Sequence, residues 1–217
     1  MARLLALANP ASGSGKTSAA VGIASMLVDL GQRVLAVDLD AQAHLTRAFA
    51  IDAETLSCSL FDVLVHALPV TEAMLDTDAG LDVLPATLEL SGVEAFLITR
   101  SGREQLLRHA LADVVDDYDW IIVDCASSLG LLTQNALAAA DVVLMPVRQH
   151  SPRAEAQLLA SMDEVRRFVN PALEFRGLLV IGGAGLDASV VSVSMAIPHP
   201  PMALNAYREF AKRLLAA

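Results

Sequence analysis

Residues 9–18, NPASGSGKTS, place a lysine and a hydroxyl residue directly after a glycine-rich turn. Gly13 and Gly15 can adopt backbone angles that other residues avoid, so consecutive amides can curl around an anion at the start of a helix. Lys16, one of only two lysines in the chain, would set its ammonium against terminal phosphates, and the Thr17 hydroxyl would bind Mg²⁺. The segment therefore predicts phosphate binding by Gly13, Ser14, Gly15, Lys16, Thr17 and Ser18.

The match to the usual phosphate-binding P-loop is incomplete, because that pattern has a glycine where this chain has Pro10. The alternative is a turn rich in glycine and serine that only caps a helix. The flanking segments favour phosphate binding. Residues 3–8 form an apolar run of strand length, and residues 17–30 carry apolar residues at helical intervals before Gly31. Strand, glycine loop and helix are the context that such a loop requires.

Carboxylates follow two further apolar segments. Residues 33–38 predict a strand that ends at Asp38, with Asp40 two positions later, and residues 120–124 predict a strand that ends at Asp124. The carboxyl ends of parallel strands meet at one edge of a sheet, which is where a phosphate-binding loop also lies. We therefore expect Asp124 to reach Mg²⁺ beside the loop.

The rest of the chain alternates between helical and strand patterns. Helices are expected at residues 57–68, 102–115, 131–140, 152–168 and 203–215, and strands at residues 81–85, 142–146 and 177–181. This order predicts an α/β fold, a mostly parallel twisted sheet flanked by helices on both faces, in a single domain at residues 1–217. The hydrophobic content of 54% fits strands that are covered on both faces.

Composition also bounds the location of the protein. No apolar run reaches about 18 residues, and the first residues are too short for a secretory signal, so a cytoplasmic protein is expected. Cys58 and Cys125 lie in apolar surroundings, which favours buried thiols over a disulfide. The histidines show no ligand spacing, so no histidine metal cluster is expected.

Five segments in order resemble the signatures of ParA/MinD-type ATPases, which are partition and positioning ATPases with a deviant Walker A box. They are residues 9–17, 37–42, 82–86, 118–124 and 135–141. The resemblance implies ATP hydrolysis with Mg²⁺, a homodimer that forms face to face on ATP binding, and an activating partner such as a ParB-like protein. Family members act on nucleoid DNA or on membranes.

The resemblance also implies roles for single residues. Lys16 contacts phosphate and acts in catalysis, and Asp40 orients the attacking water. Thr17 and Asp124 serve the metal, while Asp38 supports the metal shell.

One departure from the family concerns catalysis directly. The family's signature lysine, which reaches the partner's phosphates across the dimer, is replaced by Ala11. One explanation is that another cation takes over, as is thought for the McdA proteins that position carboxysomes. Arg148 and Arg153, just after residues 142–146, are the candidates, with solvated loop arginines as the alternative. The other explanation is that hydrolysis is slow or lost, leaving an ATP-binding adaptor or regulator.

Charge limits the DNA hypothesis. The net charge is −10, so binding to DNA needs a local basic patch. Thin candidates are Arg100, Arg103 and Arg108, Arg166 and Arg167, and Arg208, Lys212 and Arg213. Residues 203–217 carry few cations for a membrane helix like that of MinD, so no membrane binding is expected.

The segment at residues 182–201 is the least regular part of the chain. Family members carry base contacts and basic residues there, and this chain is shorter, so both adenine recognition and DNA binding lose their expected carriers. A third interpretation, more remote, is a metabolic P-loop enzyme such as a dethiobiotin-synthetase relative. The segment at residues 135–141 argues against it.

Overall fold

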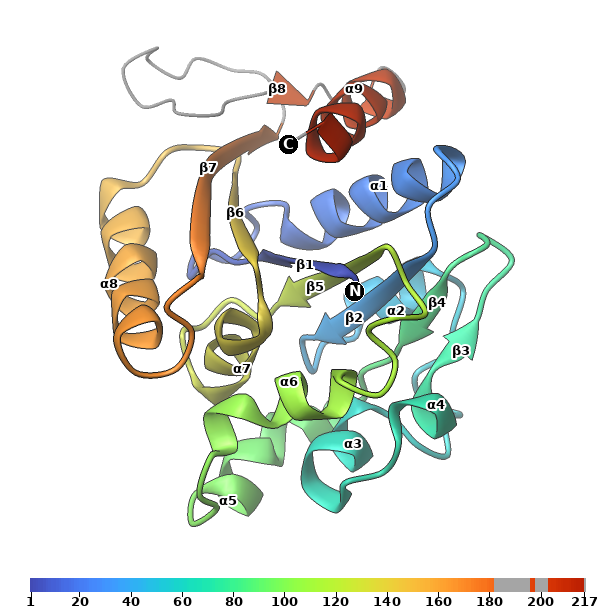
Figure 1. Ribbon diagram of the computed structural model, residues 1–217, viewed down its shortest axis with the longest axis vertical. Coiled ribbons are helices and arrows are strands. Elements are labelled where there is room, and N and C mark those ends of the chain that lie inside the picture. Colours follow the sequence, from blue (N-terminus) through green and yellow to red (C-terminus); the bar gives the residue numbers. More distant parts are fainter. Residues whose placement is uncertain (182–195, 198–202, 217) are drawn as a thin grey trace.

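A computed structural model describes residues 1–181, 196–197 and 203–216. Within these residues the sheet has eight strands in the order β3-β4-β2-β5-β1-β6-β7-β8, and every pair is parallel except β3 with β4. The strands are β1 (Arg3–Leu7), β2 (Val34–Leu39), β3 (Leu75–Asp76), β4 (Asp82–Leu84), β5 (Trp120–Cys125), β6 (Val142–Val147), β7 (Glu174–Ile181) and β8 (Ala196–Ile197). The predicted mostly parallel α/β fold is confirmed (Figure 1).

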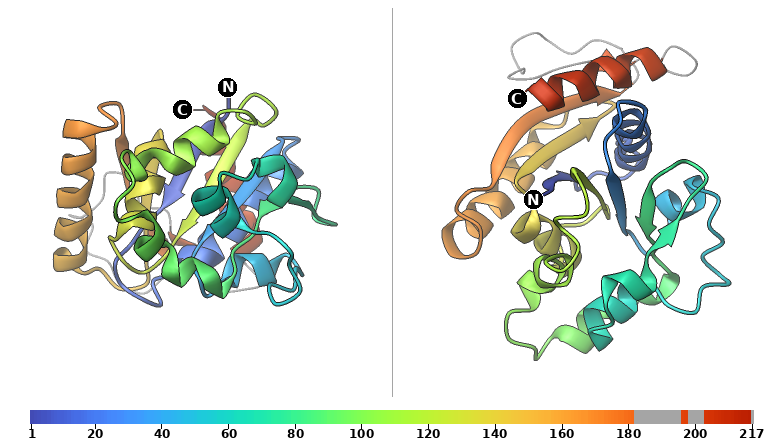
Figure 2. Two further views of the ribbon diagram at one scale, coloured as in Figure 1. Left: turned by 90° about the horizontal axis from the view of Figure 1, so that it is seen from below. Right: turned by 45° about the vertical axis from the view of Figure 1, so that its right-hand side comes forward.

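Helices cover both faces of the sheet (Figure 2). The longer helices α1 (Lys16–Asp29) and α9 (Ala203–Ala216) lie together on one face, where the short α2 (His44–Ala48) also packs. The other face carries α3 (Leu60–His66), α4 (Val70–Ala73), α5 (Val93–Leu97), α6 (Leu106–Leu111), α7 (Leu131–Ala139) and α8 (Pro152–Phe168). Short 3₁₀ turns, η1 (Leu88–Gly92) and η2 (Arg103–Gln105), precede α5 and α6.

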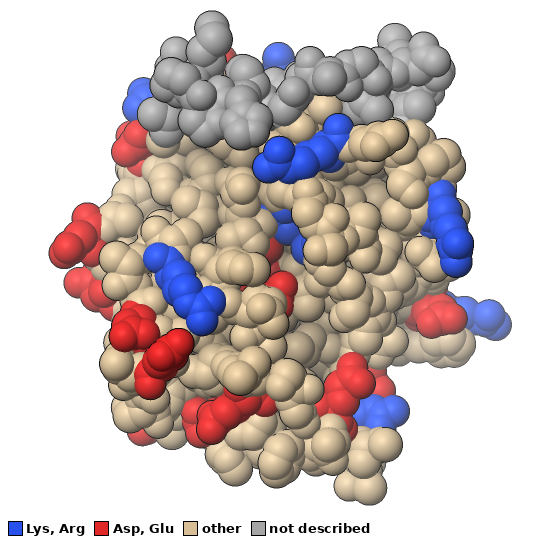
Figure 3. Space-filling model, turned by 180° about the vertical axis from the view of Figure 1, so that it is seen from behind, with Lys and Arg blue, Asp and Glu red and all other residues tan. Residues whose placement is uncertain are grey.

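Positive side chains do not merge into one patch on the face shown in Figure 3, where they stand apart on a mostly uncharged surface. Ion pairs also offset several of the positive charges. Four of the basic residues that the sequence offers for DNA each meet a carboxylate: Arg103 with Glu104, Arg166 with Asp163, Arg208 with Asp29, and Lys212 with Glu209. Within the described residues no helix is long and apolar enough to cross a bilayer.

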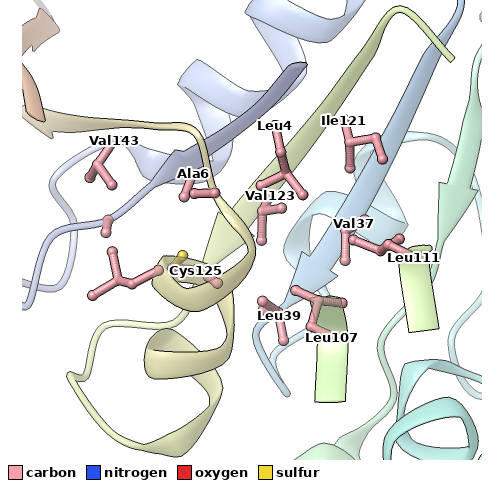
Figure 4. Packing of buried hydrophobic residues seen from close by; sticks show 14 of the residues in the cluster. Leu4, Ala6, Val37, Leu39, Leu107, Leu111, Ile121, Val123, Cys125 and Val143 are labelled. Carbon is pink, nitrogen blue, oxygen red and sulfur yellow. The ribbon is translucent and has the colours of Figure 1, made fainter. Parts of the chain in front are cut away.

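Alternate residues of each central strand pack against opposite helix layers. In β1, Leu4 and Ala6 face the layer of α6 and α7, whereas Leu5 and Leu7 face α1. Figure 4 shows Leu4 and Ala6 near Val123 of β5, and Leu107 of α6 beside Leu39 of β2 in the same cluster. By the same alternation, Asp124 of β5 lies on the side of the sheet that carries α1, so the predicted metal ligand points towards that helix.

The contact between α1 and α9 depends on a glycine inside α1. A Cβ atom at Gly22 would lie 2.6 Å from Cε2 of Tyr207, closer than any stable contact. Tyr207 is buried, with 6% of its surface exposed. Gly22 therefore lets the ring of α9 lie directly on the backbone of α1.

The long elements lie where the sequence predicts them, but several short ones were missed. The helix expected at residues 102–115 begins only after Gly102, which adopts a left-handed φ of +71°, and it is divided into η2 and the shorter α6, which ends at Leu111. The pattern gave no signal for α2, α4, α5, β3 or β8, which have five residues or fewer. The expectations for adenine and DNA contacts at residues 182–201 fall outside the described residues, apart from β8. Both cysteines are free, as expected, although only Cys125 is buried.

Candidate nucleotide-binding site

A cavity of about 610 Å³ opens at the carboxyl edge of the central strands. The strands β1 and β5 are neighbours, and the chain leaves them on opposite faces, into α1 and α7 respectively. A crevice forms where such connections diverge. The cavity is lined by Ser12, Gly13, Ser14, Gly15, Lys16, Thr17, Ser18, Asp40, Gln42, His44, Ser127 and Arg148.

The floor of the cavity is the loop between β1 and α1. Gly13 and Gly15 have φ values of +70° and +95°, which strain any residue with a side chain. Space at Gly15 is also tight, since a Cβ there would lie 3.1 Å from Cγ1 of Ile181. No side chain caps the first turn of α1, and no acidic residue lies in it. The free amides and the helix dipole therefore point into the cavity and favour an anion.

Asn9 fixes this loop to the neighbouring strand. Its amide nitrogen donates to the carbonyl oxygen of Pro146 in β6 at 2.7 Å. Its amide oxygen accepts from the backbone nitrogen of Ala11 at 2.8 Å. The residue is 3% exposed, so both bonds are shielded from water.

Lys16 reaches back along the loop instead of into solvent. Its ammonium donates to the carbonyl oxygens of Asn9 (3.0 Å) and Ala11 (3.3 Å) and to the hydroxyl of Ser127 (2.7 Å). Burial lowers the pKa of Lys16, and the nearby Asp124 opposes that shift. The three oxygens around the ammonium stand in for the phosphate oxygens that a nucleotide would bring.

Asp124 is a buried carboxylate without a partner. It is 1% exposed, and neither of its oxygens accepts a hydrogen bond in the described structure. Burial raises its pKa to about 7, and the charge of Asp38 adds to the rise. The Thr17 hydroxyl is near enough to lower that pKa in part, but its geometry falls short of a hydrogen bond. An orphaned carboxylate beside a hydroxyl is the oxygen-donor set that Mg²⁺ prefers, so the residues present fit the ion.

Strand alternation explains why this carboxylate points at the loop. Trp120 and Ile122 of β5 pack under α1, and Asp124 continues the same series. Asp38 of β2 lies directly beside it in the parallel register. Both carboxylates therefore face the start of α1.

Asp38 uses its oxygens within the protein. It accepts from the backbone nitrogen (2.9 Å) and hydroxyl (2.7 Å) of Thr46 and from the nitrogen of Asp40 (3.1 Å). The Thr46 hydroxyl in turn accepts from the nitrogen of Ala86 at 3.0 Å. Burial raises the pKa of Asp38. The side chain thus holds the loop after β2 in place, and its support of a metal shell stays a prediction.

The structure brings most of the sequence-predicted residues together. The loop residues and Asp40 line the cavity, and Asp38 and Asp124 are buried beneath it. Arg148 also lines it, whereas Arg153 is exposed on α8 and does not. Sequence reasoning missed Ser127. Its only signal was its position three residues after a strand-ending aspartate.

Comparison with known proteins assigns the family. A model of an AAA domain family matches residues 2–175. The chromosome partitioning protein ParA of Myxococcus xanthus is 36% identical over 181 residues, which are 82% of this chain and 64% of that protein. The sporulation initiation inhibitor protein Soj of Bacillus subtilis is 37% identical over 183 residues, 83% of this chain and 72% of Soj. The chain belongs to the ParA/Soj family of P-loop ATPases.

A solved structure similar to this ParA-family chain carries nucleotide. It is described as cobyrinic acid a,c-diamide synthase from Mycobacterium smegmatis with bound ATP analog and magnesium. The TM-score is 0.93 and the identity is 35%, over 99% of this chain and 95% of that one. That protein is named for an activity in the metabolic class, so the metabolic alternative has a structural relative.

Proposed function

We propose that this protein binds ATP with Mg²⁺ and hydrolyses it as a partition or positioning ATPase that dimerises around the nucleotide. The observation that carries the proposal is the buried carboxylate of Asp124, which has no hydrogen-bond partner in the described part of the chain and faces uncapped amides of α1. A site that holds an uncompensated buried carboxylate next to an anion-binding turn is suited to a metal complex of a phosphate. The ATP analog and magnesium in the M. smegmatis protein support the assignment.

Each residue then has a role that its position supports. The amides of the loop and the Lys16 ammonium bind the phosphates. Thr17 and Asp124 hold Mg²⁺, which neutralises charge on the terminal phosphate during transfer. Asp40 lines the cavity, and its carboxylate oxygen accepts from the nitrogen of Gln42 at 3.0 Å, which fixes the loop that would position the attacking water.

Arg148 is the proposed substitute for the missing signature lysine. Ala11 offers no charge, and of the two candidate arginines only Arg148 lines the cavity. An arginine presents a planar fork of donors that suits the oxygens of a phosphoryl group. The same cation could act within its own subunit or across the proposed homodimer.

The second candidate is an adaptor that binds ATP and turns it over poorly, and Ala11 is the observation that favours it. Partners follow the family in both cases. We propose an activating protein of the ParB type, with non-specific DNA binding weak at most. The net charge of −10 and the carboxylate pairs of Arg166, Arg208 and Lys212 support that limit.

Calorimetry with Mg²⁺-ATP tests the proposal. The wild-type chain should bind, and Lys16→Ala should weaken binding by at least about a hundredfold, because a charge-assisted contact to phosphate is lost. A Lys212→Ala variant, which removes the other lysine from an exposed pair, is the matched control and should bind normally. No heat of binding to the wild type would contradict the proposal.

Steady-state phosphate release separates the alternatives. Turnover without an amide-forming substrate, abolished by Lys16→Ala, supports the partition-type ATPase over both the adaptor and a diamide synthase. Tight binding with no turnover, with and without DNA, supports the adaptor.

A further inference from the structure

We propose that Ser127 distinguishes ATP from ADP by bonding to the terminal phosphate, an inference that rests on the proposed nucleotide site. Ser127 is exposed at the rim of the cavity, and its hydroxyl is 2.7 Å from the Lys16 ammonium. Among the described residues the ammonium has three such contacts, and this one is the shortest and the only one from outside the loop. The two residues are 111 positions apart, so the fold alone brings them together.

The position of the hydroxyl points to the terminal phosphate. The amides at the start of α1 enclose the phosphates from one side, and the lysine of such a loop reaches their far end. A hydroxyl that touches the tip of this lysine lies beside the last phosphate of a triphosphate. ADP lacks that phosphate, and its remaining phosphates are held by the loop.

The chemistry of the hydroxyl allows a change of partner. Facing Lys16, the Ser127 oxygen acts as an acceptor, which leaves its own hydrogen free. When phosphate oxygens take up the ammonium, the same hydroxyl can donate to one of them. A serine hydroxyl can change from acceptor to donor without moving its oxygen, whereas a group that only donates or only accepts could not.

The loop that carries Ser127 is anchored beyond it. The carbonyl oxygen of Ser128 accepts from the Thr133 hydroxyl at 2.6 Å. The backbone nitrogen of Leu131 donates to the Glu94 carboxylate at 2.9 Å. Gly130 leaves room for that carboxylate, since a Cβ there would lie 2.6 Å from it. Ser127 is thus held between the phosphate loop and the start of α7, so it is presented at a fixed place.

The test compares affinities for a non-hydrolysable ATP analogue and for ADP, each with Mg²⁺, in the full chain. In Ser127→Ala the analogue should bind about tenfold more weakly while ADP changes less than about twofold, because one hydrogen bond to a charged group is lost. Ser127→Thr keeps the hydroxyl and should bind the analogue and ADP with the same ratio of affinities as the wild type. Ser128→Ala removes a neighbouring hydroxyl that does not line the cavity, and should behave as wild type.

The outcomes separate this inference from the proposed function. Equal losses of affinity for both nucleotides would mean that Ser127 acts only through Lys16, and unchanged affinities for both would mean that Ser127 has no role in binding; either result overturns the inference. Failure of the wild type to bind either nucleotide would instead refute the nucleotide site itself. Ser127→Cys serves as a second variant if Ser127→Ala does not fold, and it should also lower the affinity for the analogue relative to that for ADP.

Discussion

At the scale of single residues, the dominant feature of the site is the unfavourable burial of the Asp124 carboxyl. Asp124 is almost inaccessible to water and has no hydrogen-bond partner among the residues that the structure describes. Such a group lowers the stability of the empty protein, and the cost is recovered when a cation binds. A buried carboxyl with a strongly shifted pKa is typical of sites that are prepared for a ligand.

This predicts how the stability of the nucleotide-free protein depends on pH. The pKa of Asp124 is raised from 3.8 to about 7, so the folded state holds its proton more tightly than the unfolded chain. The contribution of the carboxyl is therefore favourable at low pH and is lost as the pH rises from about 4 to about 7. In Asp124→Asn this loss disappears. The gain in unfolding free energy over wild type should be larger at pH 8 than at pH 5 by about 3 kcal/mol.

Denaturant unfolding without Mg²⁺ and nucleotide measures both values. Asp38 and Lys16 both interact with the charge of Asp124, so the difference between the two pH values reports the Asp124 carboxyl together with these two couplings. The same gain at both pH values would show that the Asp124 carboxyl is not desolvated.

At the scale of elements, the long segments follow from the sequence because burial on both sides leaves continuous apolar runs. The strand β5 has all six residues buried and was predicted from that run alone. The phosphate loop was also predictable, since its glycines and Lys16 carry the chemistry in order. The short α5 and the contact of Ser127 with Lys16 were not, because they depend on packing between distant segments. Asp38 shows the same limit, since its bonds to Thr46 depend on a loop geometry that the sequence does not reveal.

The contact of α1 with α9 gives a prediction at this scale. In an isolated helix, Gly22→Ala would stabilise by about 0.5–1 kcal/mol. Here the new methyl group would overlap the Tyr207 ring, so we expect a net loss of about 1–3 kcal/mol. Thermal or denaturant unfolding of the variant measures it.

The matched control removes the obstacle. Tyr207→Leu lacks the ring atoms that approach Gly22, so in that background the substitution at Gly22 should cost much less. A stabilising effect of Gly22→Ala in the otherwise wild-type chain would mean that α9 does not lie on α1 as described.

At the scale of the whole molecule, the net charge is strongly negative, whereas catalysis depends on single positive side chains near the cavity. The net charge of −10 disfavours broad attraction to other polyanions, so the cations that remain near the cavity matter individually. Arg148 is one of them. Burial raises the pKa of Tyr207 to about 12 and the charge of Arg148 opposes this rise, so Arg148 lies near α9 as well as the cavity.

We therefore expect Arg148→Ala to reduce the turnover number by a factor on the order of 10³ while the affinity for Mg²⁺-ATP changes only a few-fold, as for other arginines that act on the transition state. Arg153→Ala is the matched control on the neighbouring helix and should retain turnover. Phosphate release under saturating ATP provides the measurement. Equal rates for Arg148→Ala and wild type would leave Ala11 without a substitute.

The two hydrogen bonds of the Asn9 side chain have a consequence for Arg148. Pro146, whose carbonyl Asn9 holds, lies two residues before Arg148, and Ala11, whose amide it also holds, occupies the position of the missing lysine. One amide side chain thus connects the backbone at Ala11, where a charge is absent, to the strand end that carries Arg148, the charge proposed to replace it. Asn9→Ala would remove this connection and let the two backbone segments move apart, although every charged group would still be present.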